Sequence, residues 1–219
     1  MLSLRKLVLG FGGLALLCTP AFAQGQGRGF GGMMGGGGAM LLGNPGVQKE
    51  LKFTEEQTSK AQTALTEIRE AHQEESQALR SPDLDQAERQ TKMAALSKAM
   101  LSEATKALSL TETQTKRLHQ ISLQFRRAQA FTDPEVAKDL KITDDQKKQI
   151  QELVTESGAK AQEIRQANQD DRAEAMKQVQ ALQKETGTKV MALMTDDQKK
   201  AWKEMTGTPY EVVFAPRPN

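Results

Sequence analysis

The sequence predicts an all-α protein made of two tandem repeats of long antiparallel helical hairpins, packed on each other as the halves of a pseudo-dimer. Three observations lead to this prediction. A helix-start motif occurs four times, the segment around it is duplicated, and apolar residues recur at helical spacing between the copies.

The helix-start motif is Thr-x-x-Gln preceded by an apolar residue. It occurs at Thr54 and Gln57, Thr111 and Gln114, Thr143 and Gln146, and Thr195 and Gln198. In a capping box, the Thr hydroxyl accepts a bond from an N–H of the first turn while the Gln side chain reaches back. Each cap stabilises its helix by about 1 kcal/mol, so we expect a helix after each Thr and a structural role for these residues. A polar residue follows every Gln, so the apolar residue before each Thr is expected to pack on a neighbouring helix.

The duplication is clearest between residues 44–57 and 133–146. Each segment opens with a cap residue followed by a proline, Pro45 or Pro134, and many identical residues follow. Each copy carries two of the motifs, which gives a repeat unit of roughly 85–90 residues. We therefore predict one helical repeat over residues 44–131 and a second over 132–207.

Between the motifs, apolar residues recur three or four positions apart, as they do on one face of a helix. These stripes are narrow, rich in Ala and Met and poor in aromatic residues. We expect such helices to bury little area each and to form a thin, elongated arrangement. The residues expected to offer an apolar surface to a binding partner are Leu65, Ile68, Met93, Leu96, Met100, Met176, Val179 and Leu182.

Residues 1–23 are typical of a secretory signal peptide. Arg5 and Lys6 precede an apolar run, and Ala21-Phe22-Ala23 is a small-x-small cleavage site. The run is too short and too rich in glycine for a transmembrane anchor, and Leu17 before Cys18 disfavours a lipoprotein site. We therefore expect export to the periplasm and no membrane span in the mature chain.

Two further segments flank the repeats. Residues 24–43 are dense in glycine and predict a flexible leader, although Met33, Met34 and Met40 leave a soft copper site as an alternative. Residues 208–219 predict an extended, proline-rich tail, in which Val212, Val213 and Phe214 lie across a helix face.

Charge and composition disfavour several classes of function. Cleavage after residue 23 removes two basic residues and no acidic ones, which leaves 28 basic against 28 acidic residues. A chain this close to neutral gives no support to a nucleic-acid partner. Loss of Cys18 leaves no thiol for a disulfide, a nucleophile or a metal site. His72 and His119 each stand alone, and acidic pairs such as Asp144 and Asp145 suit helix starts, so we expect no cofactor, no metal and no enzymatic activity.

The apolar-Thr-x-x-Gln motifs, two per repeat in an exported, cysteine-free helical chain, resemble those of the LTxxQ family of Spy- and CpxP-like periplasmic proteins. The resemblance covers roughly residues 44–206. It implies helical hairpins, an antiparallel homodimer that forms a cradle, and binding of unfolded or partly folded proteins without ATP. This chain carries four motifs where such a subunit carries two, and it lacks a strong positive charge. Either a monomeric pseudo-dimer or a homodimer is therefore expected.

Three functions follow as hypotheses. The first is an ATP-independent chaperone that binds stressed envelope proteins through its apolar stripes. The second is a periplasmic protein that binds or senses zinc or copper, which the scarcity of histidine disfavours. The third is a helical scaffold with one dedicated partner.

Overall fold

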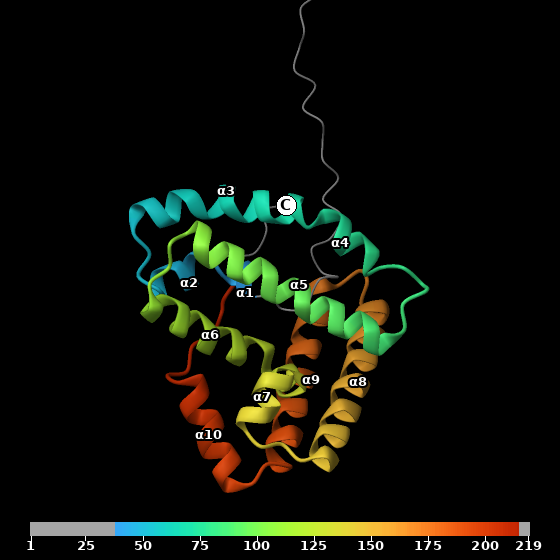
Figure 1. The fold of residues 1–219 in the computed structure, drawn as a ribbon. Helices are drawn as coiled ribbons and strands as arrows, with labels where there is room; N and C mark the ends of the chain where they lie inside the picture. Colours follow the sequence, from blue (N-terminus) through green and yellow to red (C-terminus); the bar gives the residue numbers. More distant parts are fainter. Residues whose placement is uncertain (1–37, 215–219) are drawn as a thin grey trace, which may run out of the picture. The chain divides into compact units, whose positions relative to one another are not determined.

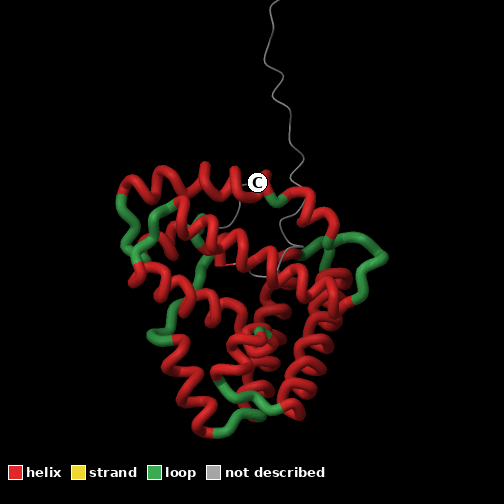
Figure 2. The backbone as a smooth tube through the Cα atoms, in the orientation of Figure 1, coloured by secondary structure: helices red, strands yellow, loops and turns green. Residues whose placement is uncertain are grey.

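The computed structural model describes residues 38–214, and in this range the chain is helical without any strand, which confirms the predicted fold class (Figures 1 and 2). The predicted signal peptide, residues 24–37 of the predicted leader and residues 215–219 lie outside the described range. The helices are α1 (Gly38–Leu41), α2 (Pro45–Glu50), α3 (Glu55–Ala71), α4 (Gln73–Ala78), α5 (Gln86–Ala107), α6 (Glu112–Arg126), the 3₁₀ helix η2 (Arg127–Thr132), α7 (Pro134–Asp139), α8 (Asp144–Ala167), α9 (Arg172–Ala192) and α10 (Asp196–Thr206). Within residues 38–214, no helix combines the length and apolar character needed to cross a bilayer.

The two repeats share one order of helices. A short helix that begins with proline, α2 or α7, is followed by a long helix, α3 or α8, then by a second long helix, α5 or α9, and by a last helix, α6 or α10. The second long helix packs on the first in each repeat, and α8 and α9 lie side by side along their length (Figure 1). The duplication seen in the sequence is therefore a duplication of the fold.

Each repeat has its own apolar core. Val47, Leu118 and Ile121 are among the fully buried residues of the first cluster, and Ile150 and Val190 of the second. Helices of both repeats supply few residues each. For example, Ile150 and Ala161 are the buried residues of the 24-residue helix α8. This agrees with the expectation that narrow stripes bury little area.

The prediction of a flexible leader up to residue 43 is wrong for its last residues. Residues 38–41 form α1, and Leu41 and Leu42 are at most 1% exposed in the first core. The glycines before them conceal this in the sequence, although two adjacent leucines supply the buried apolar area that a glycine tract lacks.

This correction also moves the start of each repeat. Extending the alignment backwards without gaps pairs α1 with η2, and the buried residues correspond: Ala39 with Ala128, and Leu42 with Phe131. α1 packs on α5 as η2 packs on α9. The structural repeats are therefore residues 38–126 and 127–206, each opening with a short buried turn.

The repeats exchange their C-terminal ends. Leu123, near the end of α6, is buried in the core of the second repeat, while Tyr210 and Val212 of the tail pack against the core of the first. The helices α6 and α10, which are equivalent in the two repeats, also pack on each other. This reciprocal contact joins the repeats in the manner expected of a pseudo-dimer.

Polar contacts fix the exchanged ends at equivalent places. Asn44, the N-cap of α2, donates from Nδ2 to the Val213 carbonyl at 2.8 Å, whereas Asp133, the N-cap of α7, accepts from Arg126 of α6 at 2.9 Å. Gly46 leaves room for the tail, because a Cβ there would lie 2.9 Å from the Tyr210 hydroxyl. The tail thus covers a helix as predicted, through Val212 and through Phe214, whose ring centroid lies 5.8 Å from that of Phe125 on α6. Val213 and Phe214 remain more than half exposed.

Candidate functional site

All four predicted capping boxes form. Each Thr hydroxyl accepts from the backbone N–H of its Gln, and each Gln Oε1 accepts from the N–H of its Thr. The helices α3, α6, α8 and α10 therefore begin where the sequence places them. The prediction is confirmed for Thr54, Gln57, Thr111, Gln114, Thr143, Gln146, Thr195 and Gln198.

The glutamines also pair with each other, which the motif alone does not reveal. Gln57 Nε2 donates to Gln114 Oε1 at 3.1 Å, and Gln114 Nε2 donates to Gln57 Oε1 at 2.9 Å. The second N–H of each amide reaches the end of another helix: Gln57 donates to the Leu108 carbonyl, and Gln114 to the Leu51 carbonyl. Both glutamines are 9% exposed and fully hydrogen-bonded, so this is a closed polar network.

The second repeat contains the same pair. Gln146 and Gln198 exchange two bonds of 2.9 Å, and their remaining N–H groups reach the carbonyls of Leu193 and Lys141. Each pair ties two helix starts to two helix ends. The motif residues are therefore the joint that holds each repeat, rather than a surface that meets a ligand.

The helix ends at these joints have their own signature. Lys52, Ser109 and Lys141 have φ near +50°, and the N–H of the next residue bonds the carbonyl five positions back, which is a Schellman cap. The fourth helix end, at Leu193, lacks this left-handed residue. The apolar residues before each Thr pack into the cores as expected: Phe53, Leu110, Ile142 and Met194.

The residues predicted to offer an apolar surface fall into two groups. Ile68, Leu96 and Val179 are 7–8% exposed, so the expectation that they are accessible is wrong; they belong to the interior because the long helices pack along these stripes. Leu65, Met93, Met100 and Leu182 are half-buried, and Met176 is 63% exposed.

The accessible residues lie on long helices that bury few of their side chains. Leu96 and Ala104 are the buried residues among the described side chains of α5, and Met93, Met100 and Leu101 beside them are only partly covered. On α8, Leu153, Val154 and Ile164 are likewise half-buried. Met and Leu side chains at such positions can repack against different apolar surfaces.

His72 is held between two carboxylates. It ends α3, and its Nδ1 lies 2.9 Å from Glu75 Oε2 of α4 while its Nε2 lies 3.1 Å from the Glu103 carboxylate of α5. The hydrogen bonds to Glu75 and then to Glu103 raise the pKa of His72 above its ordinary value of 6.5. His119 is exposed. No group of His, Cys, Asp or Glu side chains in residues 38–214 has the geometry to hold a metal ion.

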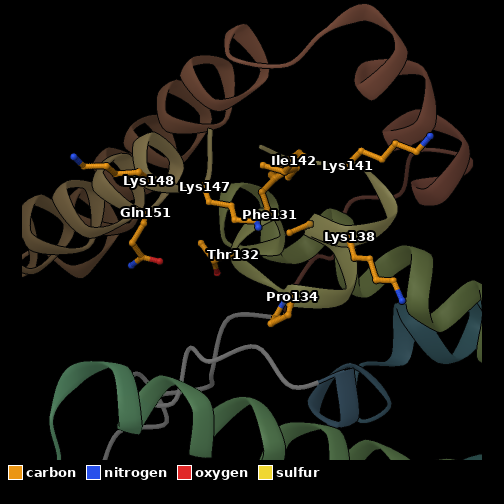
Figure 3. A pocket seen from close by; sticks show the side chains of 10 residues that line it. Phe131, Thr132, Pro134, Lys138, Lys141, Ile142, Lys147, Lys148 and Gln151 are labelled. Carbon is orange, nitrogen blue, oxygen red and sulfur yellow. The ribbon is translucent and has the colours of Figure 1, made fainter. Parts of the chain in front are cut away.

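A hollow of about 670 Å³ lies beside α7 and the start of α8 (Figure 3). Phe131, Pro134 and Ile142 form its apolar part, and lysines stand around it. Lys147 is paired with Asp144 at 2.8 Å, while Lys138, Lys141 and Lys148 point in different directions (Figure 3). The polar groups do not converge on one point, as the groups of a small-molecule site do.

Comparisons of the chain with models of known protein families, with curated proteins and with solved structures found no match.

Proposed function

We propose that this protein binds unfolded or partly folded proteins of the cell envelope without ATP, and acts as a periplasmic chaperone without enzymatic activity. The observation that carries the proposal is the contrast between hydrogen-bonded helix ends and the partly exposed apolar side chains between them. Capped helix starts and glutamine pairs fix the ends of the long helices, while half-buried Met and Leu residues line the helices between them.

The physical argument concerns how apolar side chains are displayed. A large exposed apolar patch promotes aggregation of the protein that carries it. Half-buried stripes avoid that hazard, because each side chain remains covered on one side by its own repeat. An unfolded segment then covers the other side, and the flexible Met93 and Met100, together with the more exposed Met176, adapt to its sequence.

The resemblance to the LTxxQ family supports the same proposal, and the predicted signal peptide supports a periplasmic location. The near-neutral charge makes apolar contact, rather than attraction between opposite charges, the main source of affinity.

The test is light scattering from a chemically denatured, aggregation-prone protein diluted into buffer that contains this protein and no ATP. We expect suppression near stoichiometric amounts. The triple variant Met93→Gln, Met100→Gln, Met176→Gln should lose most of it, because Gln keeps the side-chain length but resists burial. Met40→Gln is the matched control, since Met40 is 37% exposed but belongs to the short helix α1 and not to a long-helix stripe.

No suppression at several-fold excess would contradict the proposal. A triple variant as active as the unchanged protein would show that the stripes are not the binding surface. In either case, one saturable partner recovered from an envelope extract would favour a dedicated scaffold instead.

A further inference from the structure

The junction between α3 and α4 contains a charged contact that the proposed function leaves unexplained. The helical path breaks at His72, whose φ and ψ are −100° and 16°, and the His72 side chain is only 13% exposed. It contacts α4 through Glu75 and α5 through Glu103. One imidazole ring therefore connects three helices.

The chemistry of this contact requires a proton. An ionised carboxylate only accepts hydrogen bonds, and a neutral imidazole donates from one nitrogen while its other nitrogen accepts. Neutral His72 would donate a hydrogen bond to one carboxylate, while the lone pair of its other ring nitrogen would face the second carboxylate. Only the imidazolium donates to both Glu75 and Glu103, so the protonated form is the one that satisfies every group in this contact.

The contact borders the apolar core of the first repeat. Ile68 lies one helical turn before His72 on α3, and Met100 lies one turn before Glu103 on α5. Ile68 belongs to the first core, and Met100 packs against it. Arg69 on α3 lies near His72 in the sequence, and Lys106 on α5 lies near Glu103. The hydrogen-bonding partners of the ring, however, are the two glutamates.

The second repeat has no such contact. Continuing the alignment of the repeats without gaps puts Ala161 where the first repeat has His72, and there α8 runs unbroken from Asp144 to Ala167. The break, the histidine and its two carboxylates are thus specific to the first repeat.

We propose that protonated His72 acts as a pH-dependent latch, because its hydrogen bonds hold the α3–α4 junction against α5. When His72 loses its proton, this contact weakens and the apolar residues around Ile68 and Met100 become exposed. Because the proton is held more tightly in the folded protein, the stabilisation is complete at low pH and is lost as pH rises through the raised pKa. The consequence for clients, which rests on the proposed chaperone function, is tighter binding at higher pH.

The latch itself is tested by NMR titration of the histidine ring protons in the full chain, with His119→Gln to assign the two signals. We expect Glu103→Gln and Glu75→Gln each to lower the midpoint of His72 by about one pH unit or less. Glu74→Gln is the matched control, because Glu74 lies beside Glu75 in the first turn of α4 but has no bond to the ring. A midpoint that Glu103→Gln leaves unchanged would overturn the latch.

Exposure is tested with the fluorescent apolar dye ANS, which reports it without any client. Fluorescence of the unchanged protein should rise between about pH 5.5 and pH 9, with the same midpoint as the His72 signal. His72→Ala, which copies the second repeat, should stay at the higher level throughout. Equal fluorescence at both pH values in the unchanged protein would overturn the proposal. A pH-dependent rise without suppression of client aggregation at any pH would instead contradict the chaperone function and leave the latch standing.

Discussion

The two repeats share their joints and differ at the far end of their hairpins. Both close on a crossed pair of glutamines with nearly identical bonds. Away from that joint, the first repeat breaks at His72, forms the short helix α4 and returns through a loop that Arg89 holds by bonds to the carbonyls of Leu79, Ser81 and Leu84. The second repeat runs straight through α8. The two repeats are therefore alike at the glutamine joint and differ at the opposite end of the hairpin.

Substitutions in the two cores should have the largest effects on stability. Ile150 is fully buried in the second repeat, so Ile150→Ala should lower the free energy of unfolding by about 2–5 kcal/mol. Ile121→Ala should do the same in the first repeat, where Ile121 is also fully buried. Since each repeat lends its end to the other core, both variants should shift one shared transition in denaturant unfolding. Two separate transitions would show that the repeats unfold independently.

The glutamine pairs give the next largest effect. Gln114→Ala removes the cap contact, the partner of Gln57 and the donor to the Leu51 carbonyl, and should cost about 2–3 kcal/mol. Gln198→Ala should cost a similar amount in the second repeat. In a double-mutant cycle, Gln57→Ala combined with Gln114→Ala should cost less than the two single changes together. Exact additivity would mean that the pair is not an energetic unit.

The two helix ends that precede the motifs of the second repeat should respond oppositely to glycine. Lys141 has φ of 52°, a conformation that glycine adopts more easily, so Lys141→Gly should raise the free energy of unfolding by about 0.5–1 kcal/mol. Leu193, at the matching place before the fourth motif, has φ of −77°, and Leu193→Gly should be destabilising. Thermal unfolding of the two variants measures both signs, and a loss of stability in Lys141→Gly would contradict the account.

The smallest expected effect is the loss, at low pH, of the ion pair between Asp133 and Arg126, at the place where the first repeat has the uncharged Asn44. Partial burial raises the pKa of Asp133, but the hydrogen bond and charge of Arg126 outweigh it and hold the pKa below its ordinary value. Stability from this pair is present above that ordinary value and is lost as pH falls through the lowered one. Asp133→Asn, which copies Asn44 of the first repeat, should remove this dependence, worth about 0.2–1 kcal/mol. Acid unfolding curves that superimpose for the two proteins would contradict it.

The features predicted from the sequence are those with local causes. A capping box involves residues three positions apart, so the spacing of Thr54 and Gln57 predicts it directly. The pairing of Gln57 with Gln114 depends on how two distant helix starts meet, and no spacing in the sequence expresses that. Periodicity identifies the stripes but not how deeply each residue is covered, so it predicts Ile68 and Leu96 at the surface although both lie in the interior.

Two further features of the structure are not predicted from the sequence, and particular residues explain why. Leu41 and Leu42 follow a glycine tract, which obscured the short helix that opens the first repeat. A single histidine on a helix gave no sign of its partners, because Glu103 reaches His72 from another helix. A weak signal was available, since the alignment sets His72 against Ala161 and so marks the place where the repeats diverge.

In the proposed function, half-buried and exposed methionines on the long helices bind clients while the glutamine joints stay fixed. Methyl NMR of the methionines during addition of an unfolded client tests it most directly. We expect shifts and broadening at Met93, Met100 and Met176, and none at Met194, which is 4% exposed beside a glutamine joint. Unchanged signals at the first three on addition of a client whose aggregation the protein suppresses would contradict it.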